Sequence, residues 1–163
     1  MIAISSRPVK KNWVTIGFAS TLYLCPILEL LLADIPTAWQ AEVRLGLQEA
    51  LVNAAKHGNK LDPSKKVVVR FAEIQDQYWW VISDQGPGFS PIYDCGMNLT
   101  DGHYISNDND NAADRYSPEA ERECGRGLFI LDRIFDRVEW NSQGTELTLV
   151  KRMKNASRLP LVR

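Results

Sequence analysis

The chain has 163 residues, 45% of them hydrophobic, and a net charge of -1 from 19 basic and 20 acidic side chains. This length favours one domain with a sizeable core, and the balanced charge excludes a strong overall field for nucleic acid or an anionic membrane. The three cysteines lack a CxxC spacing, so we expect free thiols, a reducing compartment and a cytoplasmic protein. The N-terminus lacks the regions of a signal peptide, and Glu29 and Asp34 argue against a membrane span over residues 13–35.

In chain order, the first expected elements are a strand and two helices. Residues 12–19 alternate apolar and polar side chains, which predicts a strand. The leucine-rich run 21–34 predicts a buried helix with Pro26 in its first turn. Residues 38–57 predict a long amphipathic helix that ends at Gly58. The buried stripe of this helix is expected to consist of Val43, Leu47, Ala50, Leu51 and Ala54.

The second half of the chain is expected to hold strands 66–74, 77–83, 137–141 and 145–152 and a helix from Gly127 to Asp136. Gln75 and Asp76 predict a tight turn between the first two of these strands. The segment 89–124 is rich in Gly, Pro, Asn and Asp, and such a stretch inside a compact domain is usually functional.

This order of elements predicts an α+β fold. We expect a two-layer sandwich in which an antiparallel or mixed, mostly antiparallel, sheet carries helices on one face. One domain over residues 1–163 is expected, with its core at 12–152 and a loose basic tail at 153–163.

Three short segments combine residues that are unusual choices for structure alone, and the first is Glu49-Ala-Leu-Val-Asn53-Ala-Ala-Lys56-His57-Gly58. Glu49 and Asn53 are four residues apart and share one helical face, and Lys56 lies one turn further along it. An amide oxygen can ligate Mg²⁺, an ammonium can offset phosphate charge, and a carboxylate can accept a proton from an attacking hydroxyl. The alternative for this stripe taken alone is a solvated helix face.

The second segment, Asp84-Gln-Gly86-Pro-Gly88-Phe89, directly follows a predicted strand. Its glycines let a ligand approach the backbone closely, and Asp84 can accept a hydrogen bond from an exocyclic amine. A surface turn is the alternative. The third segment, Gly125-Arg126-Gly127-Leu128, is expected to open a helix whose free N–H groups would bind an anion. Its alternative is a flexible joint between a loop and a helix.

These segments resemble the asparagine box and the two glycine boxes of the GHKL superfamily, which includes gyrase, histidine kinases and MutL. The chain is most similar to the anti-sigma-factor serine kinases of the RsbW and SpoIIAB type, in which EALVNAAKHGN, DQGPGF, GRGLFIL and GTELTLVKR recur in this order. The resemblance covers about residues 13–152. It implies a Bergerat-type sandwich that binds ATP and Mg²⁺, with a long ATP lid at 89–124.

The resemblance also implies a role for each matching residue. Asn53 would be the Mg²⁺ ligand and Glu49 the catalytic base. Asp84 would hold the adenine amino group in a pocket shaped by Gly86 and Gly88. The other residues implied to contact the nucleotide are Lys56, Gly125, Arg126 and Gly127 near the phosphates and Thr145 near the adenine.

The implied function is that of an ATP-dependent serine/threonine-protein kinase acting as an anti-sigma switch. It would phosphorylate a small STAS-domain antagonist and sequester a sigma factor or a similar partner, as a homodimer without direct contact to nucleic acid. The alternative is a non-catalytic, nucleotide-gated binding module of the same fold. We expect neither the catalytic part of a histidine kinase, for lack of a preceding phospho-acceptor helix, nor a gyrase-like or MutL-like ATPase, for lack of a transducer domain. The sequence contains no P-loop motif and no HRD or DFG set.

Overall fold

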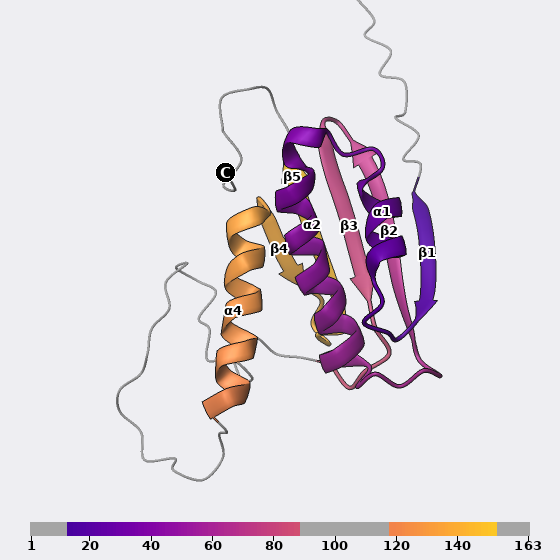
Figure 1. Ribbon diagram of the computed structural model, residues 1–163, viewed down its shortest axis with the longest axis vertical. Coiled ribbons are helices and arrows are strands. Elements are labelled where there is room, and N and C mark those ends of the chain that lie inside the picture. Colours follow the sequence, from indigo (N-terminus) through magenta and orange to yellow (C-terminus); the bar gives the residue numbers. More distant parts are fainter. Residues whose placement is uncertain (1–12, 89–117, 153–163) are drawn as a thin grey trace, which may run out of the picture.

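A single five-stranded sheet forms the base of the molecule (Figure 1). The computed structural model describes residues 13–88 and 118–152, so the predicted basic tail and most of the predicted lid lie outside the described residues. The strand order is β1-β2-β3-β5-β4, and all four pairings between neighbours are antiparallel. The strands are β1 (Val14–Ala19), β2 (Lys66–Ile74), β3 (Gln77–Ser83), β4 (Arg137–Trp140) and β5 (Glu146–Arg152).

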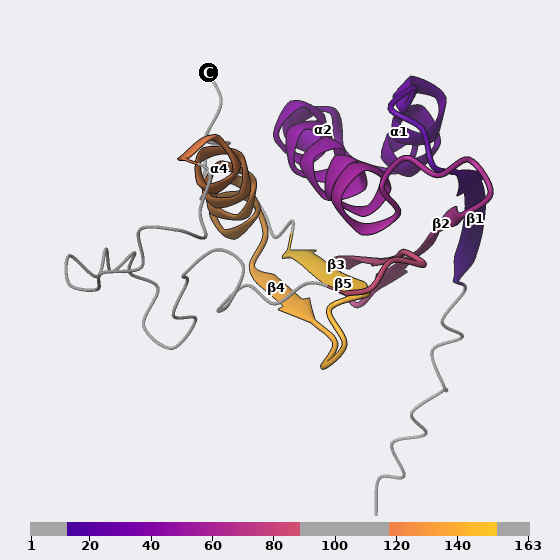
Figure 2. The same cartoon turned by 90° about the horizontal axis from the view of Figure 1, so that it is seen from below.

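The helices all lie on one face of this sheet, as Figure 2 shows from below. They are α1 (Cys25–Leu32), α2 (Thr37–Val52), a π-helical turn η1 (Asn53–Gly58) and α4 (Pro118–Ile134). The predicted α+β sandwich with helices on one face is therefore confirmed, and its sheet is antiparallel within the described residues rather than mixed.

The hairpin between β2 and β3 follows the predicted tight turn. Ile74 pairs with Gln77, and the two residues between them, Gln75 and Asp76, have positive φ angles of 51° and 61°. Two consecutive left-handed residues are the geometry of a type I′ turn, whose twist matches that of the flanking strands. The turn therefore sets the register that carries β3 to its end at Ser83.

The core lies between the sheet and α2. All five residues of the predicted stripe are buried, four on α2 and Ala54 in η1, with exposures from 0% at Val43 to 7% at Ala54. On the sheet, Trp80 is fully buried and stacks with Phe71, while the ring of Phe135 meets it edge-on. Because each large apolar side chain removed from water contributes about 1.5–3 kcal/mol, this layer fixes α2 firmly against the sheet.

The long central helix changes its geometry where it reaches the candidate site. A single α-helix to His57 was predicted, but the helix becomes π-helical over Asn53–Gly58, and the N–H of Asn59 donates to the carbonyl of Ala54 at 2.9 Å. The left-handed residues that follow are Lys60 and Leu61, with φ angles of 57° and 56°, so Gly58 is not the left-handed cap of this helix. Single π-helical turns occur frequently at functional sites.

The predicted start of the last helix was wrong. The helix α4 begins at Pro118 rather than Gly127, so Gly125 and Gly127 lie inside it and their N–H groups do not form a free helix N-terminus. A Pro is favoured in the first turn of a helix, whereas a glycine inside a helix is unfavourable, which explains why the glycine pair suggested a boundary.

Two further expectations concern the described residues only. Cys25 is a free, exposed thiol, as expected, while Cys95 lies outside the described residues. Among the helices in the described part of the chain, none is both long enough and apolar enough to cross a membrane.

Candidate functional site

The loop after β3 is fixed by hydrogen bonds from its successive N–H groups. The N–H of Asp84 donates to the carbonyl of Thr145 at 3.0 Å, and the N–H of Gly86 donates to Asp84 Oδ1 at 2.8 Å. Burial raises the pKa of the half-buried Asp84 carboxyl, and the Gly86 N–H and the charge of Lys65 partly offset this effect. No partner for Asp84 Oδ2 is found among the described residues, so this oxygen can accept another hydrogen bond.

Two glycines allow the end of the central helix to touch this loop. A Cβ at Gly58 would lie 2.5 Å from Asp84 Cγ, and a Cβ at Gly86 would lie 2.1 Å from the carbonyl oxygen of Gly58. Neither position has room for a side chain. Gly58 is therefore required by its contact with Asp84 rather than by a left-handed backbone, since its φ is not positive.

A third glycine places the same loop against the β4–β5 hairpin. Gly88 has a φ of 96°, and a Cβ there would lie 2.0 Å from the Gln143 carbonyl oxygen and 3.8 Å from Thr145 Cγ2. The structure thus brings Asp84, Gly86, Gly88 and Thr145 together.

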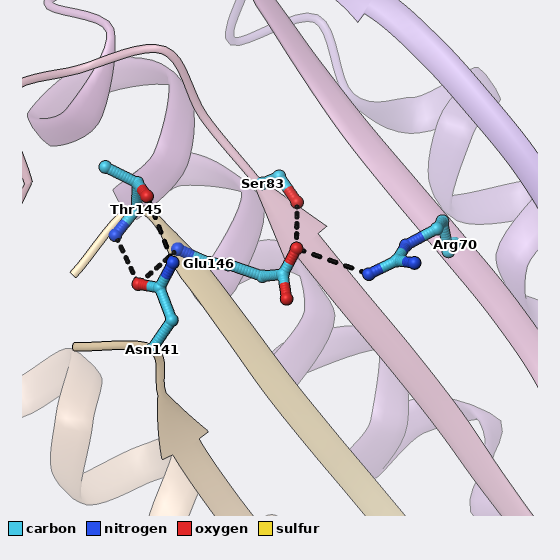
Figure 3. Close-up of polar contacts among 5 residues, drawn as sticks. All are labelled: Arg70, Ser83, Asn141, Thr145 and Glu146. Atoms are coloured by element: carbon cyan, nitrogen blue, oxygen red, sulfur yellow. Dashed lines mark hydrogen bonds and ion pairs between the residues drawn. The ribbon is translucent and has the colours of Figure 1, made fainter. Parts of the chain in front are cut away.

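The position of Thr145 depends on Asn141, which the sequence analysis did not single out. Asn141 Oδ1 accepts from the N–H groups of Thr145 and Glu146 at 2.9 and 3.2 Å, and its Nδ2 donates to Thr145 Oγ1 at 3.2 Å. Figure 3 shows that the Glu146 carboxylate in turn accepts hydrogen bonds from Ser83 on β3 and Arg70 on β2. A hairpin turn is the usual place for such asparagine contacts.

A second group of predicted residues meets between α2 and α4. A Cβ at Gly127 would lie 3.4 Å from Glu49 Oε2 and 3.6 and 3.8 Å from the amide atoms of Asn53. The half-buried Glu49 and Asn53 side chains therefore point to the same place, and Gly127 of α4 leaves the space above them open. One carboxylate and one carboxamide therefore converge beside Gly127, which has no side chain.

The remaining predicted residues lie near these two groups along the chain. Lys56 is half-buried in η1, between Asn53 and Gly58. Arg126 is exposed on α4 next to Gly127, and Gly125 lies one residue earlier in the same helix. The turn η1 links the two groups, since it starts at Asn53 and ends at Gly58.

The sequence analysis missed Asn59, which is fully buried directly after η1. Its Oδ1 accepts from the N–H of Gln85 at 2.7 Å, and its Nδ2 donates to Ser20 Oγ at 2.7 Å and to the Lys66 carbonyl at 3.0 Å. An asparagine after a glycine is typical of an exposed turn. The one signal in the sequence was its place at the end of the EALVNAAKHGN segment, and this place indicated no role for Asn59.

The arrangement has two chemically different ends. Around Asp84, a carboxylate oxygen can accept a hydrogen bond from a flat, amine-bearing group. Around Glu49 and Asn53, the hard oxygens suit a hydrated divalent cation, and the Glu49 carboxylate can accept a proton. Among the described residues, no three His, Cys, Asp or Glu side chains gather to hold a metal by themselves.

The chain matches a known class of ATPase domain. Residues 27–151 match the histidine kinase-like ATPase domain, and the chain belongs to this family. The match begins in α1 and ends in β5, so it includes both ends of the candidate site.

Curated relatives of the chain include proteins named serine-protein kinase RsbW and anti-sigma F factor. The chain is 30% identical over 97 residues to the serine-protein kinase RsbW of Bacillus licheniformis, a match that covers 60% of this chain and 54% of the relative. It is 26% identical over 115 residues to the anti-sigma F factor of Clostridium perfringens strain SM101, covering 69% and 71%. It is 31% identical over 113 residues to RsbW of Staphylococcus epidermidis, covering 68% and 64%. The chain thus spans about half the length of the first of these relatives.

Proposed function

We propose that this protein is an ATP-dependent serine/threonine-protein kinase that acts as an anti-sigma switch. The observation that carries the proposal is the convergence of Glu49 Oε2 and the Asn53 amide at Gly127. It supplies a proton acceptor and a magnesium ligand at one place, in a chain whose relatives are named serine-protein kinase and anti-sigma factor.

The loop at Asp84 supports adenine as the bound base. Asp84 Oδ2 would accept from the exocyclic amine, while Gly86, Gly88 and Thr145 would surround the ring. Lys56, Gly125, Arg126 and Gly127 would lie toward the phosphates, and Asn53 would hold Mg²⁺. When bound, Mg²⁺ would neutralise negative charge between the phosphate groups.

In the proposed reaction, the hydroxyl oxygen of the substrate serine or threonine forms a bond to the γ-phosphorus of ATP. The bond from that phosphorus to the bridging oxygen of ADP breaks, and the Glu49 carboxylate accepts the hydroxyl proton. The half-buried position of Glu49 at the junction of α2 and α4 keeps the carboxylate oriented while it remains reachable. Products are ADP and a phosphorylated protein.

The proposed substrate is a STAS-domain antagonist, and the proposed regulated partner is a sigma factor, with the chain acting as a homodimer. Support comes from the relatives named anti-sigma F factor and RsbW. Phosphorylation of the antagonist would leave the sigma factor bound to this protein.

The test is transfer from labelled ATP with Mg²⁺ to STAS-domain proteins encoded in the same genome, followed by mass spectrometry of the phosphorylated residue. Glu49→Gln should keep ATP binding and lose transfer by about 10²–10⁴-fold, the contribution of a general base. Glu73→Gln removes an exposed carboxylate of β2 by the same change and serves as the matched control.

Transfer that Glu49→Gln leaves intact would contradict the assigned base. ATP binding by the wild type without transfer to the partner it binds would instead favour the nucleotide-gated binding module. Partner capture by the full chain in the presence of ATP or ADP identifies which STAS protein and sigma factor to use.

A further inference from the structure

The fully buried Asn59 side chain joins three parts of the fold at the proposed base pocket. It contacts the end of β1 through Ser20, the start of β2 through the Lys66 carbonyl, and the loop after β3 through the N–H of Gln85. A buried amide has up to four hydrogen bonds to satisfy, and here three well-formed ones are made.

The Gln85 contact bears directly on Asp84, its neighbour in the chain. Three successive N–H groups of this loop each have a fixed acceptor: Thr145 for Asp84, Asn59 for Gln85, and the Asp84 carboxylate for Gly86. Of these acceptors, only Asn59 comes from the segment that follows the central helix. The Gln85 side chain adds a second connection, since its Oε1 accepts from the N–H of Lys66 at 2.7 Å.

Gly58, which precedes Asn59, allows the end of the helix to pack closely against the loop after β3. The Asp84 carboxyl occupies the space beside Gly58 where a side chain would be, and the Gly58 carbonyl oxygen abuts Gly86. The Asn59–Gln85 hydrogen bond therefore holds the loop against the helix end directly beside the Asp84 carboxyl.

We propose that Asn59 is a positioning residue that aims the Asp84 carboxylate at the nucleotide base, and so determines affinity and selectivity for adenine. It does not touch the nucleotide. Its effect is separate from phosphoryl transfer, because Asn53 lies at the other end of η1 and Glu49 lies in α2 before it. The inference rests on the proposed function, since it requires that Asp84 binds the base.

The experiment measures binding of ATP, GTP and inorganic triphosphate to the full chain by calorimetry, together with KM and kcat for ATP. Asn59→Ala should weaken ATP binding by about tenfold and reduce the ATP-over-GTP preference, the size expected when a buried hydrogen bond that orients a ligand group is lost. Binding of inorganic triphosphate should be unchanged, and KM should rise while kcat at saturating ATP stays the same.

Two further variants distinguish positioning from stability. Ser20→Ala removes a hydrogen bond from the other side of Asn59 and leaves the Gln85 contact in place, so it should lower the melting temperature and keep the wild-type Kd for ATP. Gln85→Ala loosens the same loop from an exposed position, and it should weaken ATP binding even if Asn59→Ala does not fold.

A merely structural role would give a different result. A destabilised Asn59→Ala protein would lose affinity for ATP, GTP and inorganic triphosphate by the same factor, because only the fraction of folded protein changes. That outcome, or an unchanged ATP-over-GTP preference in both Asn59→Ala and Gln85→Ala, would overturn this inference and leave the proposed function standing. A wild-type chain that binds no ATP would overturn the proposed function and the inference together.

Discussion

Glu42 of α2 and Lys151 of β5 form an ion pair of 2.8 Å in which both side chains are buried. Lys151 Nζ also donates to the carbonyl of Ile134, the last residue of α4, and lies 4.8 Å from the ring centre of Trp39. One buried ammonium thus ties α2, α4 and the sheet together. Glu42 lies two helical turns before Glu49, and Ile134 lies two turns after Gly127. The pair therefore helps to hold together the two helices that carry the proposed phosphate end of the site.

The first prediction concerns this pair. Lys151→Met should lower the free energy of unfolding by about 3–5 kcal/mol, because it leaves the Glu42 carboxylate buried without its cation. Combining Lys151→Met with Glu42→Leu should restore part of the loss, since no unpaired charge remains. Urea unfolding of the single and double variants measures both effects. A single variant as stable as the wild type, or a double variant less stable than either single one, would show that the pair does not act as a unit.

The second prediction compares two helical glycines. A Cβ at Gly127 meets its neighbours at 3.4 Å or more, so Gly127→Ala should fold and gain up to about 1 kcal/mol of helix stability. The added methyl fills the space above Glu49 and Asn53, and we expect phosphoryl transfer to fall at least tenfold. Gly46→Ala is the counterpart, because its Cβ would lie 2.5 Å from the Phe135 ring and should cost about 1–3 kcal/mol by overpacking. Thermal unfolding and transfer assays measure the contrast, and equal activity of Gly127→Ala and wild type would contradict the proposed site.

The third prediction uses the charge of Asp84. Burial raises the pKa of this carboxyl in the folded protein, so the unfolded chain ionises it more readily. Asp84 therefore reduces stability once the pH lies above its folded pKa, and this reduction disappears as the pH falls below its ordinary value. Asp84→Asn should be more stable than the wild type at a pH of about 7 and equally stable at a pH of about 3.

Urea unfolding of ligand-free protein across this pH range provides the measurement for Asp84. Asp132→Asn, an exposed change of the same kind on α4, is the control. A wild type that is more stable than Asp84→Asn at neutral pH would contradict the role of burial. Asp84→Asn should also lose ATP binding, because its amide nitrogen would face the donor of the adenine amine.

The fourth prediction concerns the hairpin that holds Thr145. Asn141→Ala removes three hydrogen bonds within an exposed turn, so it should cost only about 1 kcal/mol of stability. ATP binding should weaken because Thr145 is no longer fixed beside Gly88. Arg137→Ala, which breaks an exposed ion pair with Glu139 elsewhere on the hairpin, should leave ATP binding unchanged. Titration with ATP measures the affinity of both variants. Equal affinities would refute the link between the Asn141 contacts with Thr145 and ATP binding.

Much of the fold was predictable because local patterns determine it. The strands at 66–74 and 77–83 were expected at the bounds that the structure gives to β2 and β3. The helical spacing of Val43, Leu47 and Leu51 reflects the buried face of α2, and the structure confirms it. The start of α4 was not predictable from local preferences, since Gly125 and Gly127 disfavour the helix that contains them.

The candidate site was predictable where a residue type carries the chemistry and unpredictable where packing does. Glu49, Asn53 and Asp84 were singled out because a carboxylate or amide at that spacing suggests a use. Asn59 escaped notice because its burial arises from contacts with Ser20 and Gln85, which lie 39 and 26 residues away. The Glu42–Lys151 pair spans 109 residues, and nothing local connects its members.

The most direct test of the account is calorimetric titration of ATP with Mg²⁺ into the wild type, Asp84→Ala and Glu49→Gln. The account predicts one ATP per chain for the wild type, a similar Kd for Glu49→Gln, and a Kd at least tenfold weaker for Asp84→Ala, because the two carboxylates serve opposite ends of the site. Wild-type affinity in a folded Asp84→Ala protein, or no ATP binding by the wild type, would contradict it.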